Sequence, residues 1–157
     1  MYKATVRWLI RRNIARLSQG DHRPALAMFA DDAVLTFPGD NSWSGMFRAP
    51  EPGRAPGRTH RGKAEIEAFL VRYVEHGLQM EVEDVLVNGP PWNARAAAIV
   101  HDWIVGPDGH DVYANRAVIY VHTRWGRIYL EEDFEDTERS AAFDRLMAES
   151  APASTPA

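Results

Sequence analysis

Apolar residues recur every three or four positions in the first part of the chain. Over residues 3–18 this stripe consists of Val6, Leu9, Ile10, Ile14 and Leu17. The spacing predicts an amphipathic helix that Gly20 ends. A second, short helix follows, in which Asp21 is the expected cap, Pro24 lies in the first turn, and Leu26 and Phe29 face the core.

The same period returns further along the chain. A third helix is predicted over residues 63–76, with an apolar stripe made of Ile66, Phe69, Leu70, Tyr73 and Val74 and with Gly77 as its stop. Between the second and third helices, residues 34–37 form a short β-prone run. Residues 39–61 are rich in glycine and proline, which predicts a long loop or lid.

After Gly77 the apolar period changes towards two. Four strands are predicted, at residues 78–87, 93–105, 111–123 and 127–135. Their short connections favour antiparallel neighbours, and a change of phase near Asp84 predicts a bulge. Thr137 or Asp136 is expected to cap a last helix. The pattern as a whole predicts one α+β domain over residues 1–149, followed by a disordered tail, 150–157.

Composition narrows the classes of function. The chain has 157 residues, a formal net charge of −4 and no cysteine. The charge disfavours nucleic acid as a partner, and the missing cysteines exclude disulfides and thiolate metal sites and favour a cytoplasmic protein. No segment has the ~20 apolar residues that a membrane span needs, so no membrane partner is expected. The six histidines form no close-spaced ligand motif, and we expect neither a metal nor another cofactor.

Three local phrases resemble the nuclear transport factor 2-like superfamily, in its SnoaL-like polyketide cyclase and ketosteroid isomerase-like branch. They are Met28-Phe29-Ala30-Asp31-Asp32-Ala33-Val34, His60-Arg61-Gly62-Lys63-Ala64-Glu65-Ile66, and Gly126-Arg127-Ile128 leading to Asp133-Phe134-Glu135-Asp136. The resemblance implies a cone-shaped roll, in which a strongly bent, mostly antiparallel sheet packs against three N-terminal helices. It also implies a deep pocket between sheet and helices, and a homodimer formed through the convex face of the sheet.

Asp133 is the first candidate for chemistry. Counted from the Gly126-Arg127-Ile128 phrase, it matches the late-strand carboxylate that acts as general acid or base in the cyclase and epoxide-hydrolase branches. A carboxyl group facing an apolar cavity is a usable proton donor near neutral pH. The alternative is that Asp133 and its acidic neighbours form a solvated edge. The two carboxyl positions of the ketosteroid isomerases fall on Phe37 and near Val118, so that activity is not expected.

The strand 93–105 offers a second candidate pair. His101 and Asp102 are adjacent, so only one of them can face the cavity. Arg116, on the next strand, could complete a catalytic set with Asp102 or form a structural ion pair with it. On that strand we favour Arg116, Val118, Tyr120 and His122 as the residues that face the cavity.

The remaining candidates are substrate-binding residues. His60 could orient a substrate oxygen or form a loop-to-helix hydrogen bond. Aromatic and apolar contacts to a ring system are assigned to Trp43, Tyr73, Trp103, Val118 and Tyr120, with Phe47 and Trp92 as further possibilities. The sequence thus favours a cofactor-independent SnoaL-like enzyme acting on a small, apolar, oxygen-bearing molecule. Alternatives are a non-catalytic protein that binds a hydrophobic ligand, or a dimeric scaffold.

Overall fold

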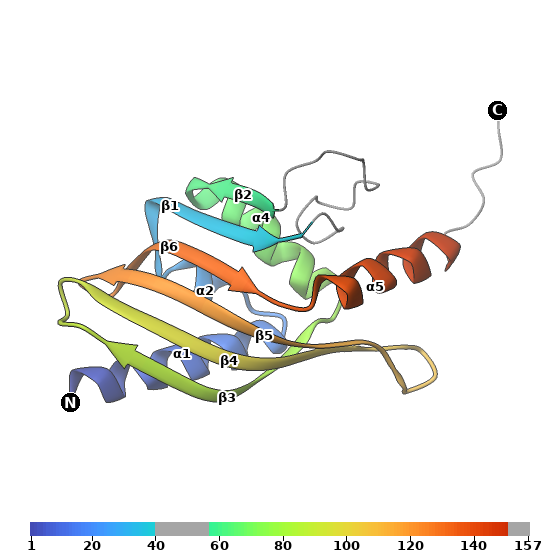
Figure 1. Ribbon diagram of the computed structural model, residues 1–157, viewed down its shortest axis with the longest axis horizontal. Coiled ribbons are helices and arrows are strands. Elements are labelled where there is room, and N and C mark those ends of the chain that lie inside the picture. The colour runs from blue at the N-terminus through green and yellow to red at the C-terminus, as the bar shows by residue number, and fades with distance from the viewer. Residues whose placement is uncertain (40–56, 151–157) are drawn as a thin grey trace.

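The computed structural model describes residues 1–39 and 57–150, which form a curved six-stranded sheet with helices packed on its inner face (Figure 1). The helices are α1 (Tyr2–Ser18), α2 (Arg23–Leu26), α4 (Gly62–Glu75) and α5 (Thr137–Ser150). The strands are β1 (Phe29–Pro38), β2 (Gly57–Arg61), β3 (Gln79–Asn88), β4 (Ala94–Val105), β5 (Asp111–Arg124) and β6 (Arg127–Phe134). The predicted α+β class is confirmed.

The sheet has the strand order β2-β1-β6-β5-β4-β3. Strands β3 to β6 form the predicted antiparallel series, while β1 pairs in parallel with β6 and antiparallel with β2. The prediction of a loop over residues 39–61 is wrong at its end, because residues 57–61 form β2; residues 40–56, like the tail from 151, lie outside the described residues. β1 is also longer than the predicted run, so Asp31 and Asp32 lie in a strand.

The predicted bulge in β3 is present, as a shift of register between Val82 and Asp84. Arginines of α1 bind the backbone there. Arg11 donates to the carbonyl oxygens of Val82 and Glu83, at 2.6 and 3.3 Å, and Arg7 donates to Val85 at 3.1 Å. These bonds satisfy carbonyl groups along the bent strand and fix α1 against the sheet edge.

The helix ends agree in part with the sequence. Gly20 and Gly77 have the left-handed backbone expected of helix stops, with φ of +83° and +67°. Asp136 caps α5, since its Oδ1 accepts a bond of 3.0 Å from the Glu138 amide. The cap assigned to Asp21 is wrong: α2 has no side-chain cap, and Asp21 pairs with Arg16 and Arg23.

Burial alternates along the central strands and identifies their inner face. On β4 the even-numbered residues are buried, and on β5 the buried residues Tyr113, Asn115, Ala117, Val121 and Thr123 are odd-numbered. The cavity-facing set expected on β5 is therefore wrong: Arg116, Val118, Tyr120 and His122 lie on the outer face. None of the helices in the described segments has the length and apolar character to cross a membrane.

Candidate functional site

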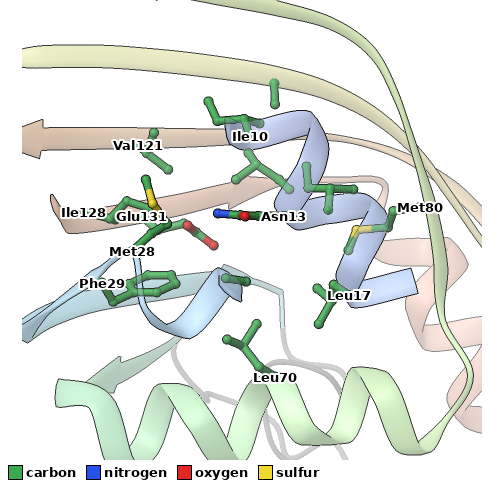
Figure 2. Close-up of a pocket in the computed structure, with 14 residues that line it drawn as sticks. Ile10, Asn13, Leu17, Met28, Phe29, Leu70, Met80, Val121, Ile128 and Glu131 are labelled. Carbon is green, nitrogen blue, oxygen red and sulfur yellow. The ribbon is translucent and has the colours of Figure 1, made fainter. Parts of the chain in front are cut away.

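An apolar cavity of about 90 Å³ lies inside the fold, between the sheet and helices α1, α2 and α4 (Figure 2). It lies at the seam between two groups of core residues, one around α4 and β1 and the other under α1. Its wall consists of Ile10, Asn13, Ile14, Leu17, Ala25, Met28, Phe29, Leu70, Met80, Ala98, Ile119, Val121, Ile128 and Glu131. Of these fourteen residues, only Asn13 and Glu131 are polar.

Asn13 and Glu131 reach into the cavity from opposite sides (Figure 2). Asn13 belongs to α1 and is 6% exposed, and Glu131 projects from β6. The guanidinium of Arg12 donates to Asn13 Oδ1 at 3.3 and 3.2 Å. Because that oxygen is already bonded, the amide nitrogen of Asn13 is the atom available to donate to a ligand.

The surroundings of Glu131 favour its neutral form. Burial raises the pKa of Glu131 to about 8. No Lys or Arg is among the buried residues of the described chain, so no buried cation offsets this effect. Glu131 is therefore mainly protonated at neutral pH and can donate a proton to an oxygen atom in the cavity.

Asp133 lies two residues further along β6 and points to the same side of the sheet. It is 9% exposed, its Oδ1 has no hydrogen-bond partner, and it is not part of the cavity wall. Burial and the neighbouring carboxyls of Glu131, Glu135 and Asp102 raise its pKa well above the usual range. The structure thus brings Asp133 and Asp102 together inside the protein, as an acidic cluster beside the cavity.

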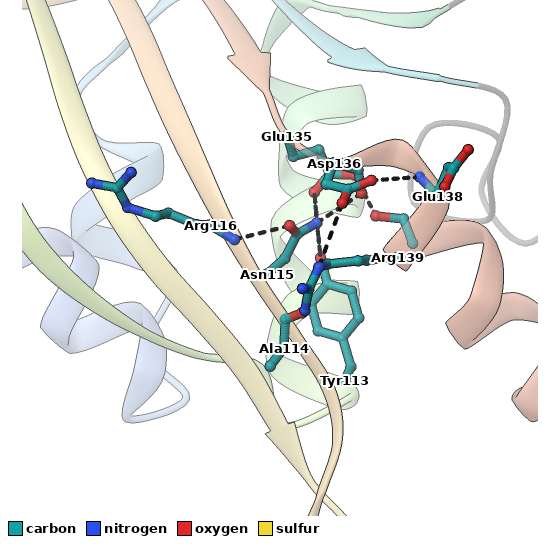
Figure 3. Close-up of polar contacts among 9 residues, drawn as sticks. Tyr113, Ala114, Asn115, Arg116, Glu135, Asp136, Glu138 and Arg139 are labelled. Carbon is teal, nitrogen blue, oxygen red and sulfur yellow. Dashed lines mark hydrogen bonds and ion pairs between the residues drawn. The ribbon is translucent and has the colours of Figure 1, made fainter.

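This cluster continues to the base of α5 (Figure 3). The Tyr113 hydroxyl donates to Asp102 Oδ2 at 3.4 Å or to Glu135 Oε2 at 3.3 Å, and Asn115 donates to the Asp136 carbonyl at 3.0 Å. Ser140 of α5 also donates to Glu135. Burial raises the pKa of Asp102 to about 6 and that of Glu135 to about 7.

Two predicted substrate-binding residues are buried in the core rather than in the cavity wall. Tyr73 packs against the rings of Phe37 and Phe69, with centroids at 6.4 and 4.9 Å. His60 is 8% exposed and lies 4.8 Å from the ring of Phe69. Both residues help to pack α4 against β1 and β2.

The other predicted residues lie on the outer face or outside the described chain. His101 and Trp103 project outwards from β4, as do Val118 and Tyr120 from β5, because each is out of phase with its buried neighbours. Arg116 forms an ion pair with Glu83 at 2.7 Å, so the expected pairing with Asp102 is wrong. Trp43 and Phe47 fall outside the described residues.

Sequence reasoning missed Asn13 and assigned no role to Glu131. Each left a signal. Asn13 is a polar residue on the same helical face as Ile10, Ile14 and Leu17, and Glu131 has the same strand phase as Asp133. Within residues 1–39 and 57–150, no three His, Asp or Glu side chains are placed to hold a metal ion.

A bent sheet that encloses an apolar cavity with three helices defines the class of nuclear transport factor 2-like proteins. The chain belongs to the SnoaL-like domain family, whose model matches residues 10–131. No curated protein sequence gives a significant match.

Solved structures share this fold. A nuclear transport factor 2-like protein of unknown function from Burkholderia pseudomallei is 18% identical, with a TM-score of 0.64 over 92% of this chain and 96% of that one. SalBIII, an epoxide hydrolase/cyclase-like enzyme of pyran ring formation in salinomycin, is 14% identical, with a TM-score of 0.63 over 87% of this chain and 95% of that one. TerC, co-crystallised with polyporic acid, is 19% identical, with a TM-score of 0.64 over 89% of this chain and 95% of that one.

Proposed function

We propose that the chain is a cofactor-independent enzyme of the SnoaL-like kind, in which Glu131 performs acid/base chemistry on a small, largely apolar, oxygen-bearing molecule held in the cavity. One observation carries this proposal: among the described residues, Glu131 is the single ionisable group in the apolar wall, and it faces the amide of Asn13. A titratable group whose pKa is shifted by an apolar cavity is a recurring feature of acid/base catalysts.

Asn13 and Glu131 have different roles in the proposed reaction. The Asn13 amide donates a hydrogen bond to the substrate oxygen and stabilises charge that develops there. Glu131 gives its proton to the substrate, and its carboxylate then takes a proton from a neighbouring carbon or hydroxyl. Asp133, next on the same face of β6, is the residue with which Glu131 exchanges protons.

The relatives support the substrate class by analogy only. SalBIII is described as epoxide hydrolase/cyclase-like, and TerC was co-crystallised with polyporic acid. In this chain, Met28 and Met80 give the cavity wall flexible side chains, which can move to admit a larger molecule.

Enolisation of an apolar ketone tests this function without knowledge of the natural substrate. 2-Tetralone is incubated with the protein in D₂O, and deuterium uptake beside the carbonyl is followed by NMR. We expect uptake above the buffer rate with the wild type, its loss with Glu131→Gln, and no change with Glu132→Gln, which alters a carboxyl on the outer face of the same strand.

The same experiment separates the rival functions. Binding of 2-tetralone without deuterium uptake would identify a non-catalytic ligand-binding protein, and absence of binding would favour a scaffold. Loss of uptake with Asp133→Asn but not with Glu131→Gln would assign the acid/base role to Asp133, as the sequence first suggested.

A homodimer through the outer face of the sheet is part of this proposal. That face carries Ile99, Val118, Tyr120, Leu130 and Phe134, of which Phe134 is 57% exposed. Burying such side chains between two copies would remove apolar surface from water.

A further inference from the structure

Trp125 occupies a position that its side chain does not favour. Arg124 pairs with Arg127 across a two-residue turn, in which Trp125 has φ of +51° and Gly126 has φ of +78°. A hairpin turn with two such residues normally carries Asn-Gly or Gly-Gly, because a bulky side chain is strained in this conformation. Trp125 is nevertheless 75% exposed, so core packing does not explain its presence.

Trp125 forms a pair with Trp92 of the turn between β3 and β4. Their ring centroids are 6.0 Å apart, and the Trp125 amide donates to the Pro91 carbonyl at 2.8 Å. The contact covers little of either ring, since Trp92 is 57% exposed. The two neighbouring turns, residues 88–93 and 124–127, therefore present a fixed pair of tryptophans to the surroundings; we call them the tryptophan end.

Basic residues surround the tryptophan end. Arg95 and Arg124 are exposed beside it, and neither turn contains an acidic residue. The start of α1 lies at this end too, because Arg7 of α1 binds Val85 whereas Ser18 binds Met80, at the far end of β3. The first half of α1 carries Lys3 and Arg7 and no acidic residue, in a chain whose net charge is −4. Basic side chains therefore lie close to both tryptophans, and the exposed acidic residues at this end of the sheet are Asp31 and Asp32 of β1.

We propose that the tryptophan end docks on the surface of an anionic lipid bilayer, with Trp92 and Trp125 at the level of the headgroups and the arginines against lipid phosphates. Tryptophan is enriched at this interface, since its ring is apolar and its N–H is polar. Basic residues near the surface add electrostatic attraction. The two turns are joined by the hydrogen bond between Trp125 and Pro91, so both rings can reach the same interface.

The cavity lies close behind this end. Ile128, three residues from Trp125, lines the cavity, and its amide donates to the Met28 carbonyl at 2.8 Å. Docking would bring the cavity near apolar molecules dissolved in the membrane. This last step rests on the proposed function, whereas lipid binding itself does not.

The test uses the full chain and vesicles of phosphatidylcholine, with or without about 30% phosphatidylglycerol, in a flotation assay. The key variant is Trp125→Asn, which restores the preferred Asn-Gly turn and so should keep or raise the melting temperature. The matched control is Val105→Asn, which removes a side chain that is 50% exposed at the opposite end of β4. We expect binding to the anionic vesicles alone, a loss of about tenfold or more with Trp125→Asn, and no loss with Val105→Asn.

Three results would overturn the proposal. The wild type could fail to float with anionic vesicles, or Trp125→Asn could bind them as well as the wild type does. Alternatively, Trp125→Asn could abolish self-association measured without lipid, which would make this end an interface between two copies of the chain. Enolisation of 2-tetralone in lipid-free buffer reports separately on the cavity, so a failure of lipid binding is distinguishable from a failure of the proposed chemistry.

Discussion

Glu131 and Asp133 project from the same face of β6, yet only Glu131 forms part of the cavity wall. The β5 partners of the two residues do not cause this difference, since Val121 and Ile119 both line the cavity. The difference lies in the neighbouring side chains, because Asp133 is close to the carboxyl groups of Asp102 and Glu135. One strand thus supplies a carboxyl group to an apolar cavity and a second carboxyl group to the acidic cluster beside it.

The pH dependence of enolisation should follow Glu131. Its pKa, raised by burial to about 8, means that the protonated acid is lost as the pH rises through that value. We expect proton donation to a ketone to decline above about pH 8 and to keep a plateau at pH 6–7. Rates of deuterium uptake by 2-tetralone at a series of pH values, corrected for the buffer rate, measure this; a rate that keeps rising past pH 9 would contradict it.

Stability should decrease as the pH rises from about 5 to 8. The pKa of Glu135 is raised by burial to about 7, so its neutral form is favoured in the folded state. Such a group contributes stability that is complete below its unfolded pKa and is lost as the pH rises through the folded value. For Glu135 alone the loss is about 3 kcal/mol. Urea unfolding at pH 5 and pH 8 measures it.

The variant Glu135→Gln isolates this effect. The amide cannot ionise, so the difference between the two pH values should shrink, while Glu132→Gln on the outer face should leave it unchanged. An equal pH dependence in Glu135→Gln and the wild type would show that other groups cause the decline.

Filling the cavity should remove ligand binding while the protein still folds. Ala98 lies in the cavity wall and is 2% exposed, so Ala98→Leu places three more carbon atoms in the empty space. We expect the affinity for 2-tetralone to fall about tenfold or more, with the free energy of unfolding lowered by no more than the ~1–3 kcal/mol that added methylenes cost in a core. The control is Ala97→Leu on the opposite face of β4, which should bind normally; normal binding by Ala98→Leu would place the ligand elsewhere.

The buried Tyr113 hydroxyl should matter more for stability than the part-buried Tyr120 hydroxyl on the outer face. Tyr113→Phe leaves the carboxyls of Asp102 and Glu135 without their shared donor, which should cost about 1–3 kcal/mol. Tyr120→Phe removes a bond of 2.9 Å to His122 on the outer face and should cost less than about 0.5 kcal/mol. Thermal and urea unfolding of both variants measure these losses of stability. Equal losses for Tyr113→Phe and Tyr120→Phe would contradict a stabilising role of the Tyr113 hydroxyl in the acidic cluster.

The oligomeric state should depend on Phe134. Its side chain is 57% exposed on the outer face of β6, and Phe134→Glu would place a charge at the centre of the proposed dimer interface. We expect sedimentation to show a dimer for the wild type and a monomer for this variant. Trp8→Glu, which changes an equally exposed residue of α1, should remain dimeric. A wild-type monomer at all concentrations would exclude the dimer.

Most elements of the fold were predictable because the sequence patterns that indicate them involve residues close together in the chain. Helix periods, the strand phases, the bulge near Asp84 and the glycine stops at Gly20 and Gly77 all depend on near neighbours in the sequence. The parallel pairing of β1 with β6 was not predicted, since it joins residues from opposite ends of the domain. The strand at residues 57–61 was missed for a similar reason, because glycine and proline just before it indicate a loop.

The candidate site was harder to predict than the fold. Strand phase shows which residues share a face, but not which of the two faces is covered by helices. The wrong choice on β5 placed Arg116 and Tyr120 in the cavity. Asn13 and Glu131 lie on different elements, far apart in the sequence, and only the packing of α1 over the sheet brings them to one cavity.

The ladder between β1 and β6 also constrains how the chain can fold. Val34 pairs with Leu130, so β1 and β2 join the sheet only through the last strand to be synthesised. Contacts between such distant residues form late, because the entropy of closing the long intervening loop must first be overcome. During synthesis, β1 and β2 therefore cannot join the sheet until β6 has left the ribosome. In that interval the N-terminal half is exposed to chaperones and to aggregation.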